Sequence, residues 1–290
     1  MIGKKRPRLA RTVAAVLATV LVVALYGFSE ARRDPVVRRV TVIMPGGGYG
    51  PHGMRIALVS DIHVDNLAMP VSRLEHIVDL INAEHPDLVL LDGDFVNGTS
   101  EHDPAAHPAS VIEPLSRLRA PLGVIGVIGN HDYLTGIPEV KAALREAGIP
   151  VLDDSAVRIG PIALAGLTET FATRTQFRQA MASARSLGGT PVIVAHAPDN
   201  VRWPAFDVPL YLTGHTHCGQ IVVGPLSNWI NLLDGKQNYD PRYRCGIVRD
   251  WGRITIVTGG LGTSHMPIRI GAPPDFWMIR LVGEKDRGWR

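Results

Sequence analysis

The stretch VPLYLTGHTH (residues 208–217) decides the fold class, because it joins an apolar run to a pair of histidines. Residues 208–213 are apolar, rich in strand-forming types and followed by glycine, which is typical of a buried strand. Positions i and i+2 of a strand point to the same face, so His215 and His217 can converge on one object. A polar surface is the alternative interpretation of such a pair, so the rest of the chain has to decide.

From residue 54 onward, apolar runs alternate with segments of helical spacing. Strands are expected at 54–60, 87–94, 122–130, 191–199 and 208–215, with a hairpin at 157–167. Helices are expected at 71–85, 137–148 and 173–187. Past residue 219 the pattern contains strands only, at 219–223, 245–250, 253–260 and 275–281. The sequence predicts an α/β domain with strands buried on both faces and a strand-rich C-terminal half.

Five of these predicted strands end in residues that can bind a metal. The candidates are Asp61 and His63, Asp94, Asn130 and His131, His196, and His215 with His217. Any one of them could be a helix cap or a turn residue, but five together at one edge of one sheet favour a site, because α/β proteins bind ligands there.

Carboxylates, an amide oxygen and imidazoles form a ligand set suited to Mn, Fe or Zn. The set is too large for one ion and sufficient for two, with Asp94 as the natural bridge. Two divalent ions about 3.5–4 Å apart activate a water and hold both oxygens of an in-line phosphoryl displacement. His131 is placed to supply a further cation near the leaving group.

The motifs DIH (61–63), GD (93–94), GNHD (129–132), a lone strand-end histidine (196) and GHTH (214–217) resemble those of the calcineurin-like metallophosphoesterases. The resemblance implies a four-layer α/β/β/α sandwich and His131 as the transition-state or leaving-group histidine. It also implies two ligand sets. The first metal would be held by Asp61, His63, Asp94 and His217, and the second by Asp94, Asn130, His196 and His215.

A narrower resemblance is to membrane-anchored bacterial phosphodiesterases of the YkuE/YaeI type, carried by HTHCGQI (215–221) and LGTSHMPIRIGAPPDF (261–276). Members of that group usually carry HTHGGQ, so Cys218 is a departure. Some relatives remove the nucleotide from a UDP-linked lipid A precursor, which implies a lipid phosphodiester or pyrophosphate as substrate.

The first residues predict a membrane anchor. Residues 1–11 are basic, and residues 12–28 contain no charge and no amphipathic pattern, which argues against a buried core helix. The five preceding cations favour a cytoplasmic N-terminus and an extracytoplasmic domain. Residues 29–31 form a poor cleavage site, so we expect a retained anchor, a tether over 29–53 and a phosphoesterase domain over 54–290. The lipid A step belongs on the cytoplasmic face, and the sequence leaves this conflict open.

Charge and cysteine content limit the partners. The net charge is +3, and removing the five cations of residues 1–11 gives +3 − 5 = −2, so the body lacks the basic surface of a nucleic-acid-binding protein. Cys218 and Cys245 could pair in an exported domain, and Cys218 could ligate metal; an inert small side chain is the preferred interpretation of Cys218.

Several further residues have two interpretations. His265 and Arg269 are candidates for binding the substrate phosphate, since arginine binds phosphate through two donors. A structural ion pair is the alternative interpretation of Arg269. Asn97 and Asp132 are expected to orient the ligands beside them. Trp229 and Tyr239 either form a hydrophobic lip for a lipid chain or cap the sandwich.

The sequence thus predicts a membrane-anchored, two-metal phosphohydrolase that cleaves a phosphodiester or pyrophosphate bond, including that of a lipid or a UDP-linked lipid A precursor. A phosphomonoesterase or protein phosphatase is the nearest alternative. A catalytically silent metal-binding module is the other, and the complete set of candidate ligands speaks against it.

Overall fold

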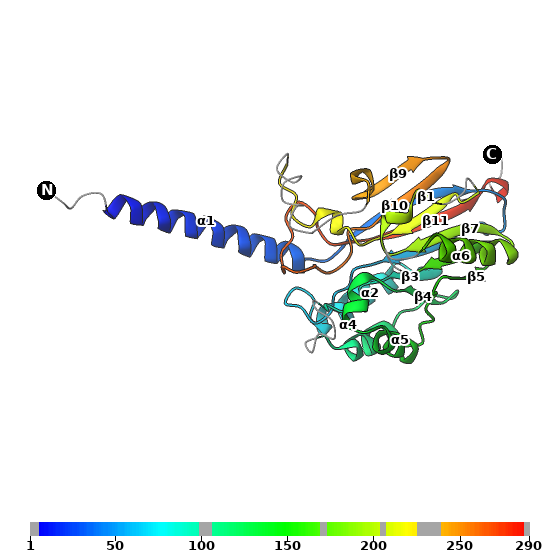
Figure 1. Ribbon diagram of the computed structural model, residues 1–290, viewed down its shortest axis with the longest axis horizontal. Helices are drawn as coiled ribbons and strands as arrows, with labels where there is room; N and C mark the ends of the chain where they lie inside the picture. The colour runs from blue at the N-terminus through cyan, green and yellow to red at the C-terminus, as the bar shows by residue number, and fades with distance from the viewer. Residues whose placement is uncertain (1–5, 99–105, 169–172, 204–206, 225–238, 287–290) are drawn as a thin grey trace.

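The computed structural model describes residues 6–98, 106–168, 173–203, 207–224 and 239–286. Figure 1 shows a long helix, α1 (Arg6–Arg32), projecting from one end of an α/β domain. The span Leu9–Arg32 is long and apolar enough to cross a membrane, and it includes the predicted segment 12–28. Most of the helix makes no contact with the domain, since only 6% of its apolar window is buried.

The first sheet has five strands in the order β1 (Val36–Met44), β11 (Asp275–Gly283), β2 (Met54–Val59), β3 (Leu88–Asp92) and β4 (Val124–Val127). Strands β2, β3 and β4 run parallel to one another, so their carboxyl ends lie at the same edge. Strand β11 runs antiparallel to β2. This arrangement brings the residues after β2, β3 and β4 together.

The second sheet has six strands. Their order is β5 (Ser155–Ile159), β6 (Ile162–Leu167), β7 (Thr190–Ala195), β8 (Leu210–Thr213), β10 (Arg253–Val257) and β9 (Gly246–Asp250). Strands β5 and β6 form the predicted hairpin, and β7 and β8 are parallel neighbours. His196 and His215 therefore follow adjacent strands of this sheet.

The two sheets pack face to face, and helices cover both outer faces. Alternate residues such as Ile56 and Leu58 of β2 point into the core between the sheets, whereas Ala57 and Val59 face the helices. Helices α2 (Val71–Ala83), α3 (Ile112–Ser116) and α5 (Ile137–Glu146) pack on the first sheet, and α6 (Arg174–Ser186) packs on the second. The predicted four-layer α/β/β/α sandwich is confirmed.

Three expectations about individual segments are wrong. The predicted tether contains β1, which pairs in parallel with β11 over nine residues, because Val42 and Met44 bury their side chains between the sheets. Residues 219–223 form a single bridge at Ile221 rather than a strand. The five predicted strand ends belong to two sheets rather than one, and they meet because both sheets present carboxyl ends at the same end of the sandwich.

Candidate metal centre

The seven predicted ligands lie together at the carboxyl ends of strands from both sheets. They come from the loops after β2, β3, β7 and β8 and from the first residue of α4 (Asn130–Thr135), which follows β4. Six of the seven, together with His131, form three overlapping groups within which the candidate ligand atoms lie within 4.8 Å of one another, and Asn130 lines the adjacent pocket. These groups are Asp61–His63–His217, His63–Asp94–His131 and Asp94–His196–His215.

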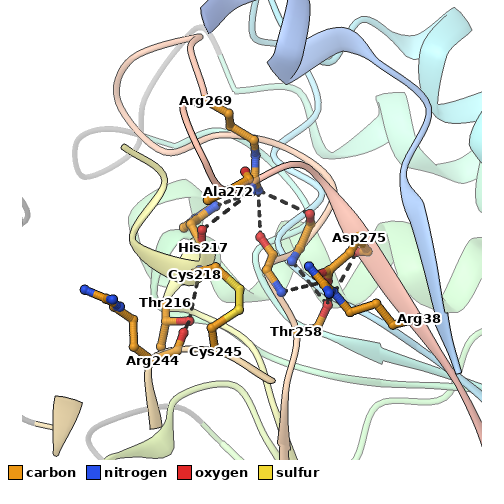
Figure 2. Close-up of a disulfide and its surroundings, with 12 residues drawn as sticks. Arg38, Thr216, His217, Cys218, Arg244, Cys245, Thr258, Arg269, Ala272 and Asp275 are labelled. Atoms are coloured by element: carbon orange, nitrogen blue, oxygen red, sulfur yellow. Dashed lines mark hydrogen bonds and ion pairs between the residues drawn. A yellow bond between two sulfur atoms is a disulfide. The ribbon is translucent and has the colours of Figure 1, made fainter. Parts of the chain in front are cut away.

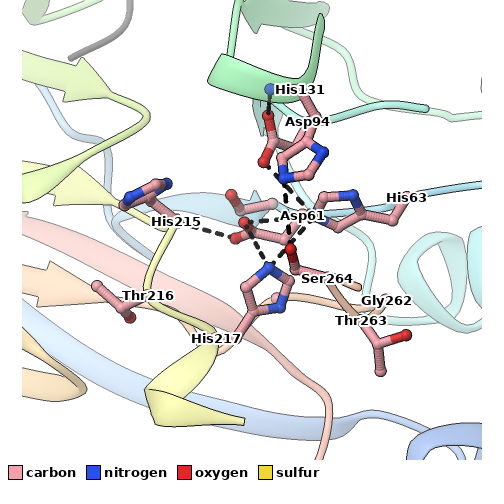
Figure 3. A network of polar contacts seen from close by, with 12 residues as sticks. Asp61, His63, Asp94, His131, His215, Thr216, His217, Gly262, Thr263 and Ser264 are labelled. Carbon is pink, nitrogen blue, oxygen red and sulfur yellow. Dashed lines mark hydrogen bonds and ion pairs between the residues drawn. The ribbon is translucent and has the colours of Figure 1, made fainter. Parts of the chain in front are cut away.

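The first group closes around the Asp61 carboxylate (Figure 3). His217 Nε2 lies 3.4 Å from Asp61 Oδ1, and His63 Nε2 lies 4.0 Å from the same oxygen. The two Nε2 atoms face each other at 3.2 Å. Two imidazole nitrogens and a carboxylate oxygen aimed at one point are a typical ligand set for a transition-metal ion.

Asp94 lies between the two halves of the site. Its Oδ2 is 3.5 Å from His63 Nε2 and 3.1 Å from His196 Nε2, so it faces both groups. Its Oδ1 accepts a hydrogen bond of 2.8 Å from the backbone N–H of His131. This central position is the one that a bridging carboxylate requires.

The backbone conformation of the site is strained. Asp61, His63, Asp94, His215 and His217 all have positive φ, between 47° and 66°. Non-glycine residues rarely adopt this left-handed region, which costs on the order of 1–3 kcal/mol each. Five of the seven candidate ligands share this conformation. The rest of the fold therefore holds these residues in place at a cost in local stability.

Glycines let the loops approach one another closely. A Cβ atom at Gly214 would lie 2.0 Å from Ser60 Oγ and 2.6 Å from Asp61 Oδ2. A Cβ atom at Gly129 would lie 2.3 Å from Asp94 Oδ1. Any larger residue at either position would push a candidate ligand out of place.

Burial keeps three of the histidines neutral. It lowers the pKa of His63 and His217 well below their ordinary value, and neighbouring imidazoles add to the effect. Burial, followed by the charge of His196, lowers the pKa of His215 to about 3. Neutral imidazoles are the form that binds metal.

The carboxylates and His196 respond to one another's charge. Burial lowers the pKa of His196, but Asp94, Asp61 and Asp92 outweigh it, so the pKa is raised well above its ordinary value. Burial raises the pKa of Asp94, yet His196, His131 and His63 outweigh it and lower the pKa. In the absence of metal, His196 therefore favours its protonated form beside Asp94 and Asp61. A metal cation would interact with the same carboxylates.

Two divalent ions fit the donor set. Asp61 Oδ1 and Asn130 Oδ1 are buried and have no hydrogen-bond partner among the described residues. Leaving a buried polar atom unpaired costs about 1–3 kcal/mol, so each oxygen is unfavourable unless something binds it. Together with the neutral imidazoles, these oxygens are suited to cations, and the assignment of the seven side chains as ligands stays a prediction.

Asp132 supports the site, as its position beside Asn130 suggested. Its Oδ2 accepts hydrogen bonds of 2.9 Å from the backbone N–H groups of Asp94 and Gly129, and its Oδ1 accepts one from Phe95. Asp132 therefore ties the loop after β3 to the loop after β4. By contrast, the side-chain oxygen of Asn97 has no hydrogen-bond partner in the described structure, so Asn97 is not seen to orient a ligand.

A pocket of about 100 Å³ opens beside the centre, and His131 lines it. His131 Nδ1 donates to the carbonyl of Gly98 at 2.5 Å, which leaves Nε2 facing the pocket, 3.3 Å from Ser264 Oγ. The other lining residues are Asp94, Asn130, His215, Thr216, His217, Gln220, Tyr239, Ser264 and His265. Tyr239 thus lines the pocket, while Trp229 lies outside the described residues.

Gln220 and Ser264 are pocket residues to which the sequence interpretation gave no role. Gln220 Nε2 donates to the carbonyls of Ser264 and Met266, and its Oε1 accepts from the backbone N–H of Ser264. Gln220 therefore fixes the loop that carries Ser264 and His265. Gln220 belongs to the motif HTHCGQI (215–221), three residues after His217, and this position in the sequence could have indicated its role.

The structure corrects the expectation that Arg269 grips substrate phosphate. The side chain is fully buried behind His217, as Figure 2 shows, and does not line the pocket. Its guanidinium donates to the carbonyls of Gly259, Gly262 and Ala272, and its Nη2 lies 3.3 Å from His217 Nδ1. These contacts make Arg269 a positioning residue for the loop of His217. His265, in contrast, is exposed at the rim of the pocket.

The structure also corrects the preferred interpretation of Cys218 as an inert side chain. Cys218 forms a disulfide with Cys245, with a Cα–Cα distance of 4.7 Å (Figure 2). The bond joins the residue after His217 to the segment that leads into β9. A hydrogen bond from Thr216 Oγ1 to the carbonyl of Arg244 connects the same two segments.

Residues 54–219 match the calcineurin-like phosphoesterase family. The chain is 30% identical over 263 residues to an uncharacterized metallophosphoesterase of Helicobacter pylori strain J99, covering 88% of this chain and 66% of that protein. It is 29% identical to a zebrafish (Danio rerio) transmembrane protein with a metallophosphoesterase domain, covering 93% of this chain and 62% of that protein.

The match to the metallophosphoesterase YkuE of Bacillus subtilis is 26% identical and covers 80% of each chain. The narrower resemblance noted in the sequence is therefore found among the relatives. The chain spans about two thirds or less of the length of the Helicobacter and zebrafish relatives.

Proposed function

Because the chain belongs to the calcineurin-like phosphoesterase family, we propose that it is a metal-dependent hydrolase of a phosphodiester or pyrophosphate bond. One observation carries the proposal. Six candidate ligands, from the loops after β2, β7 and β8 and from the start of α4, converge around Asp94, and the pocket beside them presents His131. The proposed ligand sets are Asp61, His63, Asp94 and His217 for one ion, and Asp94, Asn130, His196 and His215 for the other.

When bound, two divalent ions would supply Lewis-acid chemistry and a water of lowered pKa. The protein's own contribution is geometric. Asp94 Oδ2 faces His63 on one side and His196 on the other, and Asp94 Oδ1 is held by the backbone of His131. Burial of the loops keeps bulk water away from the ligand atoms. Manganese, iron and zinc all suit this mixture of carboxylate, amide and imidazole donors.

His131 is the proposed proton donor to the leaving oxygen. The proton on Nδ1 is occupied by the carbonyl of Gly98, so the proton that can move is the one on Nε2, which faces the pocket. Ser264 Oγ lies 3.3 Å from Nε2, and a leaving oxygen in the pocket would take the place of this hydroxyl as the acceptor of the proton. A positioned general acid of this kind contributes about 10²–10⁴-fold to the rate.

We infer that the domain lies outside the cytoplasm, anchored by α1 with residues 12–28 in the membrane. Disulfides persist in oxidising compartments and are rare in the cytosol, so the bond between Cys218 and Cys245 supports export. The cations in residues 1–11 support the same orientation. Both arguments speak against a UDP-linked lipid A precursor, which is handled on the cytoplasmic face.

The test is hydrolysis of bis(p-nitrophenyl) phosphate by the full chain in detergent, with and without Mn²⁺. We expect metal-dependent turnover that Asp94→Ala abolishes together with bound metal, and that His131→Ala lowers about 10²–10⁴-fold while metal is retained. His76→Ala is the matched control, since His76 is an exposed histidine paired with Asp34.

Each alternative gives a different result. Faster turnover of p-nitrophenyl phosphate than of the diester would identify a phosphomonoesterase. Two bound metals without turnover of either compound would favour a silent metal-binding module. Loss of metal in His131→Ala would contradict the role given to His131.

A further inference from the structure

The end of α1 is built into the loops that surround the pocket. The backbone N–H of Arg269 donates to the carbonyl of Gly27 at 2.9 Å. Arg73 donates to the carbonyls of Arg32 and Arg33, and Arg32 donates to the carbonyl of Leu67. The last turn of the helix is therefore fixed to the domain by a backbone hydrogen bond to the loop of Arg269 and by arginine side chains that connect it to α2 and to the loop of Leu67, rather than joined to it by a flexible tether.

The length of α1 then places the membrane. Buried Gly27 and Ala31 belong to the docked turn, whereas the side chains from Leu9 to Tyr26 are almost all exposed. The uncharged residues before the docked turn are 12–26, and fifteen residues at 1.5 Å each span about 22 Å, against a hydrocarbon core of about 30 Å. This stretch is no longer than the hydrocarbon core is thick, so a helix that crosses the bilayer leaves no exposed turn between the bilayer and the domain. The surface of the bilayer must therefore lie at the docked turn.

The two loops that contact α1 expose apolar side chains. Leu67 is 73% exposed and Met266 is 42% exposed. They lie on the two loops that contact α1, and Met266 directly follows His265 at the rim of the pocket. Apolar side chains at this height would enter the interfacial region instead of water.

A second hollow, of about 500 Å³, lies between the two loops that contact α1, next to the pocket. Its apolar walls are Leu67, Pro70, Val71 and Pro267, and its remaining residues are Asp65, Asn66, Thr263 and His265. His265 lines both hollows. This hollow, called the groove below, thus lies between the loop of Leu67, which contacts Arg32, and His265 at the rim of the pocket.

We propose that this groove receives the glycerol and first acyl carbons of a membrane phospholipid, whose phosphate reaches the metal centre laterally from the leaflet that faces the domain. The proposal rests on the proposed phosphoesterase activity and adds the class of substrate and its route. A lipid phosphate lies at the height where the pocket opens. A water-soluble phosphodiester gains nothing from the apolar walls of the groove.

The experiment compares two diesters that have the same leaving group. The full chain is reconstituted in phosphatidylcholine vesicles, and p-nitrophenol release is measured from bis(p-nitrophenyl) phosphate and from vesicle-embedded dioleoylphosphatidyl-p-nitrophenol. Leu67→Glu and Met266→Glu test the groove and its rim. Leu122→Glu is the matched control, since Leu122 is 43% exposed and precedes β4, at the end opposite to the site.

We expect Leu67→Glu and Met266→Glu to lower hydrolysis of the embedded lipid about 10-fold or more, which corresponds to the loss of one buried apolar side chain. Hydrolysis of the soluble diester should stay unchanged in both variants, and Leu122→Glu should change neither rate.

Two results would overturn the lipid route while leaving the phosphoesterase activity in place. One is turnover of the soluble diester without turnover of the embedded lipid. The other is an equal effect of Leu67→Glu and Leu122→Glu on the lipid. Hydrolysis of neither diester would overturn the proposed function itself, and the lipid route with it.

Discussion

Removing the disulfide between Cys218 and Cys245 should destabilise the domain by an amount that the chain length sets. The two cysteines are 27 residues apart. Closing a loop of this size removes unfolded-state entropy worth about 3.5 kcal/mol at 25 °C. For a domain of this size, 1 kcal/mol corresponds to about 2–4 °C, so the melting temperature should fall by about 7–14 °C.

The assay is thermal unfolding of the full chain in detergent, followed by circular dichroism, for wild type and for Cys218→Ser/Cys245→Ser. Wild type treated with a reductant should melt at the temperature of the double variant, and the reductant should leave the double variant unchanged. A fall of less than about 2 °C would refute the loop-closure argument, because it would show that other contacts already restrict the unfolded chain between the two cysteines.

The same variants test whether the sulfur acts at the metal centre. Thr216 and Arg269 still hold the segment of His217 when the disulfide is absent. We therefore expect two bound metals in both the double variant and Cys218→Gly, measured by elemental analysis after dialysis. Strong metal loss in Cys218→Gly would identify the sulfur as a ligand.

Three further predictions concern pH, loop anchoring and histidine positioning. In chelator-treated protein, the difference in free energy of unfolding between wild type and His215→Asn should shift against wild type as the pH drops from 6.5 to about 3, because the pKa of buried His215 is lowered to about 3 while the unfolded chain takes up the proton near 6.5. The variant is the reference because burial raises the pKa of Asp61 to about 6 and that of Asp132 to about 7, which acts in the opposite direction; urea titrations of both proteins check this, and a difference that does not change with pH would contradict it. Asp132→Ala removes the acceptor of three buried backbone N–H groups, each worth about 1–3 kcal/mol, so it should lower both the free energy of unfolding and the amount of bound metal. Urea unfolding and metal analysis check this, and the surface control Asp79→Ala should change neither quantity. Arg269→Lys loses the planar fork of donors and should weaken metal binding about 10–100-fold with KM unchanged, unlike the exposed control Arg280→Lys; a change in KM alone would restore the substrate-binding role.

Most of the candidate site was predictable because it depends on short-range patterns. A buried strand followed by Asp, His or Asn places that side chain at a carboxyl edge, whichever neighbour the strand pairs with. Asp61, Asp94 and His196 could therefore be named from the runs before them. The structure brings the predicted ligands together, although it splits their strands between two sheets.

Long-range pairing accounts for what was missed. Strand β1 pairs with β11, more than 230 residues later in the chain, so nothing near residues 36–44 shows that they join a sheet. The direction of the Arg269 side chain is decided by carbonyls of a loop that folds back over it. Similarly, the approach of Cys218 to Cys245 depends on how η3 (His217–Gly219) meets the segment before β9.

The sequence by itself determined the alternation of strands and helices, the residues offered to metal and the apolar first helix, since hydrophobic periodicity and residue chemistry are local properties. Tertiary structure alone decided that the last turn of α1 docks on the loop of Arg269, the contact on which the proposed position of the pocket at the membrane surface rests. That contact joins residues 27 and 269, and only the packing of the folded domain brings such distant backbone groups within hydrogen-bonding distance.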